Sequence, residues 1–123
     1  MLSQKRKQRN KDNLGTKLKE ARNAQGYTQK ALAEELGLEY YTMISQMELG
    51  YISIPASLWV KIADVLRMDK SRWVLMCLYQ YQPEVFQAAF GNRSINEVAI
   101  LITNLRLGNL DDLIRDAASK KNE

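Results

Sequence analysis

Hydrogen-bonding side chains are concentrated between two glycines of the 123-residue chain, Gly37 and Gly50. They carry hydroxyls and one amide, and they are Tyr40, Tyr41, Thr42, Ser45 and Gln46. Groups of this kind hold phosphate oxygens and read the edges of DNA bases, and a glutamine amide can make two hydrogen bonds to one adenine. The chemistry that these residues suggest is recognition by hydrogen bonding.

Catalytic chemistry has little support in the sequence. The chain has no histidine, a single cysteine, no glycine-rich phosphate loop and no carboxylates in a metal-binding pattern, which argues against acid–base, nucleophilic and metal sites. Cys77 lies in an apolar run, where a buried small hydrophobe is a better interpretation than a nucleophile. We therefore expect neither an enzyme nor a bound metal or cofactor.

Two short helices can position the polar side chains. Thr28 is a good N-cap for the first helix, and Leu32, Ala33 and Leu36 give that helix one apolar stripe. The methyl group of Ala33 is small enough for a second helix to cross closely. Gly37 supplies the positive φ that ends the first helix.

The second helix is expected to end at Gly50, with Leu38, Ile44 and Met47 pointing into the core. The hydroxyls and the amide then lie nearer the outer face. The order of helix, turn and helix is the plan of a helix-turn-helix DNA reader. Tyr40 and Tyr41 have two readings, because each ring can pack on the domain or each hydroxyl can contact phosphate.

The sequence around these helices resembles a known family. The matching residues are Thr28-Gln29, Leu32-Ala33, Leu36-Gly37, Ile44-Ser45-Gln46-Met47-Glu48 and Gly50, with Leu14-Gly15, Leu18, Arg22 and Gly26 before them and Pro55, Leu58, Ile62-Ala63 and Leu66 after them. Over residues 12–68 they resemble lambda-repressor-like (Cro/XRE-type) helix-turn-helix proteins. The chain from Gly37 to Gly50 is one residue longer than the commonest version, so it stays open which of Tyr40, Tyr41 and Thr42 enters the groove.

The resemblance implies an all-α, five-helix DNA-binding domain in which Gln46 faces the groove. It also implies that the loop after Gly50 follows the phosphate backbone, which makes Tyr51 and Ser53 candidates for contacts there. Gln29 lies in the first turn of its helix and is a candidate for holding a phosphate.

Arg22 has two readings. The resemblance implies an ion pair with a later acid such as Glu48, and the alternative is a phosphate contact.

Charge is unevenly distributed along the chain. Residues 1–30 hold nine basic and two acidic side chains, whereas residues 31–123 hold nine basic and twelve acidic ones. Residues 1–11 have five cations and no acid, which predicts a flexible basic arm. Its Lys5, Arg6, Lys7 and Arg9 are candidates for contacts with phosphates or a minor groove, and a solvated tail is the alternative.

Nothing in the chain predicts a membrane span or a secretory signal. A single cysteine suits a reducing compartment, so we expect a cytoplasmic protein.

Residues 69–123 predict a helical C-terminal segment. Asp69 is expected to open one helix, Pro83 a second, and the capping box from Ser94 to Glu97 a third. A final helix is expected from Asn109. We expect this segment to form a homodimer surface, because a two-fold DNA site is read by a two-fold dimer. The expected contributors are Trp73, Ile95, Val98, Ile102 and Leu105; the alternative is that they complete a monomer core.

The sequence thus predicts three parts: an arm over residues 1–11, a DNA-binding domain over residues 12–68 and a C-terminal segment over residues 69–123. The predicted function is a sequence-specific, DNA-binding transcriptional regulator of prokaryotic or phage type, which reads a palindromic site in double-stranded DNA as a homodimer. The alternative is an antitoxin-like or adaptor protein that uses the same fold to bind a protein partner.

Overall fold

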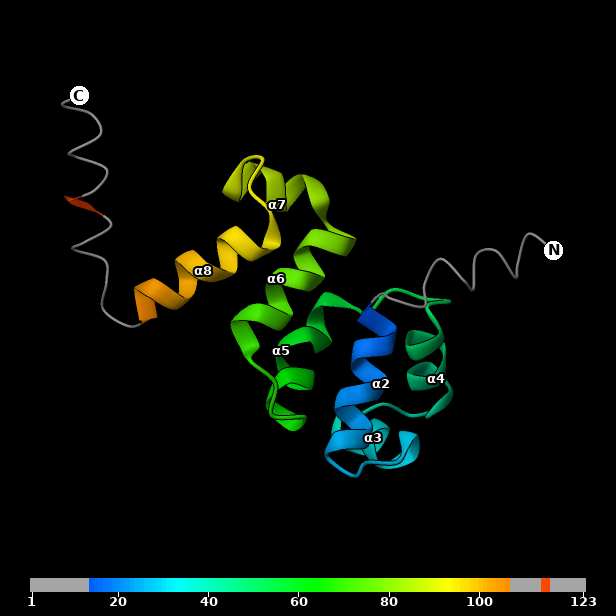
Figure 1. The fold of residues 1–123 in the computed structure, drawn as a ribbon. Helices are drawn as coiled ribbons and strands as arrows, with labels where there is room; N and C mark the ends of the chain where they lie inside the picture. Colours follow the sequence, from blue (N-terminus) through cyan, green and yellow to red (C-terminus); the bar gives the residue numbers. More distant parts are fainter. Residues whose placement is uncertain (1–13, 107–113, 116–123) are drawn as a thin grey trace.

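The computed structural model describes residues 14–106 and 114–115. Seven helices account for most of them: α2 (Leu14–Ala24), α3 (Gln29–Glu35), α4 (Thr42–Leu49), α5 (Ala56–Val65), α6 (Lys70–Tyr81), α7 (Pro83–Phe90) and α8 (Ile95–Arg106) (Figure 1). No strand occurs within these residues, and the predicted all-α fold is confirmed. The expected arm and most of the helix expected from Asn109 lie outside the described residues.

Several residues that the sequence predicts to begin or end a helix do so in the structure. The Thr28 hydroxyl accepts a hydrogen bond from the Ala31 amide at 3.0 Å, as expected of an N-cap. The Asp69 carboxylate does the same for the Arg72 amide at 3.2 Å. Gly37 adopts a φ of 72° where α3 ends, and the turn to α4 occupies residues 36–41.

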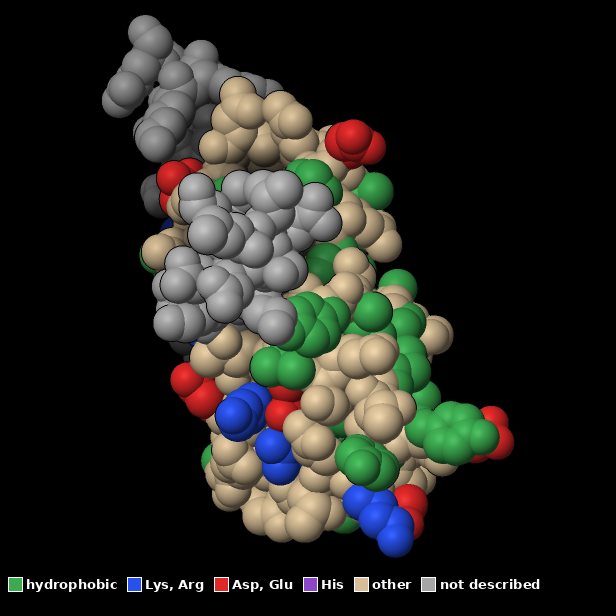
Figure 2. All heavy atoms as spheres, turned by 90° about the vertical axis from the view of Figure 1, so that its right-hand side faces the viewer, with side chains coloured by type: hydrophobic (Ala, Val, Ile, Leu, Met, Phe, Trp, Pro, Cys, Tyr) green, Lys and Arg blue, Asp and Glu red, His purple; other side chains and the backbone are tan. Residues whose placement is uncertain are grey.

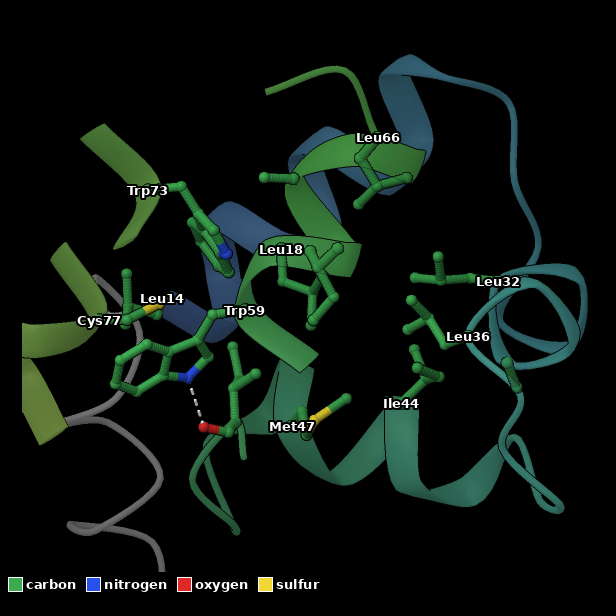
Figure 3. Close-up of a cluster of buried hydrophobic side chains, with 14 residues drawn as sticks. Leu14, Leu18, Leu32, Leu36, Ile44, Met47, Trp59, Leu66, Trp73 and Cys77 are labelled. Carbon is green, nitrogen blue, oxygen red and sulfur yellow. Dashed lines mark hydrogen bonds between the residues drawn. The ribbon is translucent and has the colours of Figure 1, made fainter. Parts of the chain in front are cut away.

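The main core lies between α2, α3, α4, α5 and one side of α6 (Figure 3). Its buried members are Leu14, Leu18, Leu32, Ala33, Leu36, Ile44, Met47, Ile54, Trp59, Ile62, Ala63, Leu66, Trp73 and Cys77. The last two come from α6, so this core extends past the boundary that we expected at residue 68.

Helices α2 and α4 pack against each other at Gly15. A Cβ atom at this position would lie 2.5 Å from the carbonyl oxygens of Met47 and Glu48, which is too close for any side chain. We expected a small side chain to be required at Ala33, and this residue is indeed buried. The stricter steric requirement at Gly15 could not be predicted from the neighbouring residues, because it depends on where α4 crosses α2.

Helix α6 is covered on two sides, as its broad apolar surface predicts. Trp73 and Cys77 face the main core, whereas Leu75 packs with Phe86 of α7 and Val98 of α8 in a second cluster. We call this second cluster the α7–α8 cluster. One helix therefore contributes to both cores.

Helix α8 packs on α6 and lies on the opposite side of the molecule from α4 (Figure 1). The Ser94 hydroxyl accepts from the Glu97 amide at 3.1 Å, which confirms the predicted start of this helix. Among the described residues, no helix is both long enough and apolar enough to cross a membrane.

Candidate functional site

The outer face of α4 and the turn before it carry the polar side chains singled out in the sequence. Tyr40 is 66% exposed and Tyr41 is 52% exposed, so neither ring belongs to the core. Thr42 and Gln46 are exposed on α4, and Ser45 is half-buried between them.

The opposite face of α4 is buried and holds the helix in place. Ile44 and Met47 are fully enclosed in the main core, and Glu48 is also buried. Since the inner face is fixed, the side chains on the outer face have defined positions relative to the domain.

A buried ion pair joins α4 to α2. Arg22 of α2 donates to Glu48 of α4 through Nε at 2.6 Å and Nη2 at 3.1 Å, and both side chains are buried. The Nη1 group of Arg22 also donates to the Tyr27 carbonyl oxygen at 2.8 Å. This geometry confirms the ion pair implied by the family resemblance, and it occupies the guanidinium that the alternative reading assigned to phosphate.

Gln29, the first residue of α3, joins the same network. Its Nε2 donates to Glu48 Oε1 at 3.1 Å, and the side chain is half-buried. One of the two amide N–H groups is thereby used, which leaves the carbonyl and the second N–H for other bonds. The sequence indicated Gln29 as a residue that holds phosphate but gave no sign that Glu48 orients it.

The loop after α4 has an exposed side and an anchored side. Tyr51 and Ser53 are exposed, whereas Ile54 is buried in the main core. Trp59 Nε1 donates to the Ile54 carbonyl oxygen at 2.7 Å. The signal for this anchor was present in the sequence, because a tryptophan off the apolar stripe of its helix has an N–H that needs a partner when buried.

Figure 2 shows the side of the molecule on which α4 lies. Over the described residues of this face, hydrophobic side chains are spread over much of the surface, and the Lys and Arg side chains are few. The candidate cations Lys5, Arg6, Lys7 and Arg9 lie outside the described residues. On the described part of this face, positive charge is therefore sparse.

The residues expected to form a dimer surface do not share one surface. Trp73 is 2% exposed in the main core and Val98 is 1% exposed in the α7–α8 cluster. We correct the assignment of these two residues, because side chains enclosed within one chain have no area to offer a second chain. Ile95 and Ile102 are half-buried against the α7–α8 cluster, and Leu105 is exposed.

Two residues of α8 that the sequence did not single out, Ile100 and Leu101, are exposed together with Leu105. The sequence shows a wide apolar arc along this helix but not which part of the arc faces α6.

Comparison with family models gives a match to part of the chain. A family model described as helix-turn-helix matches residues 18–73, a stretch that begins within α2 and ends within α6. No curated protein and no solved structure matches the chain.

Proposed function

Residues 18–73 belong to the Cro/C1-type helix-turn-helix family, and from this premise we propose that the protein is a sequence-specific transcriptional regulator of prokaryotic or phage type. The proposal is supported mainly by the difference between the two faces of α4, one buried and one exposed. Its inner face is fixed by Ile44, Met47 and Glu48, while its outer face presents an exposed amide and hydroxyls.

In the proposed complex, α4 lies in the major groove of double-stranded DNA. Gln46 reads a base, with adenine the best partner for its amide. Thr42 and Ser45 flank it on the same helix and make shorter contacts. Tyr40 and Tyr41, in the turn that leads into α4, contact the DNA at the edge of the groove.

Other residues hold the DNA backbone. Gln29 lies at the start of α3 with its orientation set by Glu48, and it contacts a phosphate with the remaining part of its amide. Tyr51 and Ser53 contact phosphates from the loop after α4. Positive charge is sparse on the described part of the face around α4 (Figure 2), and the basic arm supplies it through Lys5, Arg6, Lys7 and Arg9.

We propose that the protein reads a palindromic site as a homodimer through α8. Ile100, Leu101 and Leu105 are exposed on this helix, and no charged residue occurs between Glu97 and Arg106. Because α8 lies on the opposite side from α4 (Figure 1), a second copy bound there leaves both reading faces uncovered. Such a dimer would place one α4 on each half-site.

Sedimentation at micromolar concentration tests the dimer. Wild type should sediment as a dimer, and the double variant Leu101→Lys/Leu105→Lys should be a monomer, because a charge in an apolar interface loses its solvation. Val60→Lys is the matched control, since Val60 is an exposed apolar residue on α5. A monomeric wild type would refute the dimer.

Selection of bound sites from random duplex DNA tests the function itself. We expect a palindromic winner that binds about 10³-fold or more tightly than scrambled duplex, with half-sites about one helical turn apart. Failure to enrich any site would argue for the alternative, an antitoxin-like or adaptor protein in the cytoplasm. Salt separates the two functions, because DNA binding weakens steeply as salt rises and an apolar protein contact does not.

A further inference from the structure

The loop that follows α4 is held by an aromatic pair from two different helices. Trp59 of α5 donates its indole N–H to the Ile54 carbonyl oxygen at 2.7 Å, a bond that is drawn as a dashed line in Figure 3. Tyr81, the last residue of α6, stacks on Trp59 with ring centroids 6.3 Å apart and an interplanar angle of 27°. The contact therefore runs from α6 through Trp59 to the loop.

Tyr81 lies eight positions beyond residue 73, where the family match ends. It is half-buried against the main core. Burial raises the pKa of its hydroxyl above 10.0, and a backbone hydrogen bond with Ile54 acts in the opposite direction. Tyr81 is thus close to the loop residue whose carbonyl Trp59 already holds.

The loop itself is short, and it is also held at its start, where the Tyr51 amide donates to the Gln46 carbonyl oxygen at 2.9 Å. Gly50 ends α4 with a φ of 78°, and Pro55 precedes α5. Between them, Tyr51 and Ser53 are exposed, Ile52 is half-buried against the main core, and Ile54 is fully buried. The position of Ile54 therefore helps to set where the exposed Ser53 side chain, next to it, lies relative to α4.

We propose that Tyr81 is a positioning residue for DNA binding, because its ring keeps Trp59 in place and Trp59 fixes the Ile54 anchor of the loop that contacts the DNA backbone. This inference rests on the proposed function and adds to it a role for the C-terminal end of α6. That same helix packs against α7 and α8 through its other side. The C-terminal segment then has a part in DNA binding besides dimerisation.

Three variants test the proposal. Tyr81→Leu removes both the stacked ring and the hydroxyl, whereas Tyr81→Phe keeps the ring and removes only the hydroxyl that bonds the Ile54 backbone. Tyr79→Leu is the matched control, since Tyr79 is on the same helix but packs edge-on against Phe86 of the α7–α8 cluster at 5.2 Å.

Amide hydrogen exchange of Tyr51 to Ile54 is the first measurement, and it needs no DNA. We expect faster exchange in Tyr81→Leu, with exchange in α2 and α4 unchanged. Tyr79→Leu should match wild type in this loop, and Tyr81→Phe should lie closer to wild type than Tyr81→Leu does. Unchanged exchange in Tyr81→Leu would overturn the proposal.

Binding to the selected DNA site at several salt concentrations is the second measurement. Tyr81→Leu should bind about 3- to 10-fold more weakly, and its slope of log K against log salt should fall by the equivalent of about one phosphate. Faster loop exchange with unchanged affinity and slope would also overturn the proposal. If wild type selects no site, the proposed function fails, and the exchange measurement still decides whether Tyr81 holds the loop.

If Tyr81→Leu does not fold, Trp59→Phe provides a second route. It retains an aromatic ring and removes the N–H that bonds Ile54. The same faster exchange in the loop is expected, and unchanged exchange would count against the anchor.

Discussion

At the scale of single residues, Glu48 accepts hydrogen bonds from two helices while belonging to a third. It receives Arg22 from α2 and Gln29 from α3, and it is buried. A buried carboxylate of this kind needs its partners, because removing one of them leaves a charge without water. The orientation of Gln29 and the packing of the three helices therefore depend on the same acid.

We expect Arg22→Met to lower the free energy of unfolding by about 3–5 kcal/mol, because Glu48 then stays buried and unpaired. Urea denaturation measures this loss. The double variant Arg22→Met/Glu48→Leu should recover part of it, since both charges are gone. A loss below about 1 kcal/mol in the single variant, the range of an exposed pair, would contradict the role given to this ion pair.

Gln46→Ala is expected to cost about 1–3 kcal/mol of binding free energy on the selected site and to relax discrimination at one base pair. The reason is that, in the proposed complex, the amide makes two directed hydrogen bonds to a base edge. Binding titrations on the preferred and on scrambled duplex measure both effects. Gln80→Ala is the control, because Gln80 is an exposed glutamine on α6. Equal loss on the two duplexes would show that Gln46 does not read a base.

Cys77 makes the stability of the protein depend on alkaline pH. Burial raises the pKa of its thiol from 9.0 to about 12, so between these values the folded protein keeps a proton that the unfolded chain has lost. The free energy of unfolding should therefore fall as pH rises above about 9, by at most about 1.4 kcal/mol per pH unit. Urea denaturation from pH 8 to 11 measures this decline, and Cys77→Ala should decline less. Parallel curves for the two proteins would refute it.

Residues whose roles depend on near neighbours could be predicted from the sequence. Thr28 caps an amide three residues away and Gly37 supplies its own positive φ, so their residue types were enough to predict the ends of α3. Arg22 and Glu48 were paired only through the family resemblance. Trp59 and Tyr81 could not be paired, because their contact exists only after α5 and α6 have packed together.

At the scale of helices, the crossing of α2 and α4 decides what residue 15 can be. Helix propensity alone favours alanine over glycine by up to about 1 kcal/mol. At Gly15, however, a methyl group would meet two backbone carbonyl oxygens at 2.5 Å. Helix propensity therefore predicts that Gly15→Ala raises the free energy of unfolding, whereas packing predicts that it lowers it.

We expect packing to win, so that Gly15→Ala lowers the free energy of unfolding by about 1–3 kcal/mol, the usual cost of overpacking. Thermal or urea denaturation gives the sign directly. Gly26→Ala is an informative control, since Gly26 has open space around it and a φ of 76°, so that only backbone strain opposes the change. An increase in stability for Gly15→Ala would show that α2 and α4 can move apart.

The orientation of α8 was the part of the helical arrangement that the sequence left open. Ile95, Val98 and Ile102 recur at helical spacing, and this stripe was expected on the outside, whereas it packs inward on α6. An amphipathic pattern shows that a helix has an apolar face. It does not show whether the same chain or a second chain covers that face.

At the scale of the whole molecule, the cations of residues 1–11 and the side chains proposed to read bases lie in two different parts of the chain. The first eleven residues have five cations and no acid, whereas the described face over α4 has few cations (Figure 2). Affinity and specificity should then be separable by deletion.

Removal of residues 1–11 should weaken binding to selected and scrambled duplex by the same factor, because bonds to phosphate carry no sequence information. The slope of log K against log salt should become shallower by about 0.9 for each phosphate that the arm neutralises in the full-length protein. Titrations at four salt concentrations measure both quantities. A deletion that leaves the salt slope unchanged would show that the arm does not touch the DNA.

The double role of α6 also limits where this chain can be joined to a C-terminal segment from another protein. Trp73 and Cys77 complete the main core, while Leu75 of the same helix completes the α7–α8 cluster. A chimaera joined at residue 68 would receive a foreign α6 together with its own α7 and α8, so the foreign side chains at positions 73 and 77 would have to fit the main core of this protein. A junction at Gln82, between α6 and α7, keeps the main core and the Tyr81–Trp59 contact intact. Exchange of C-terminal segments in evolution or in design is therefore expected to occur after α6 rather than before it.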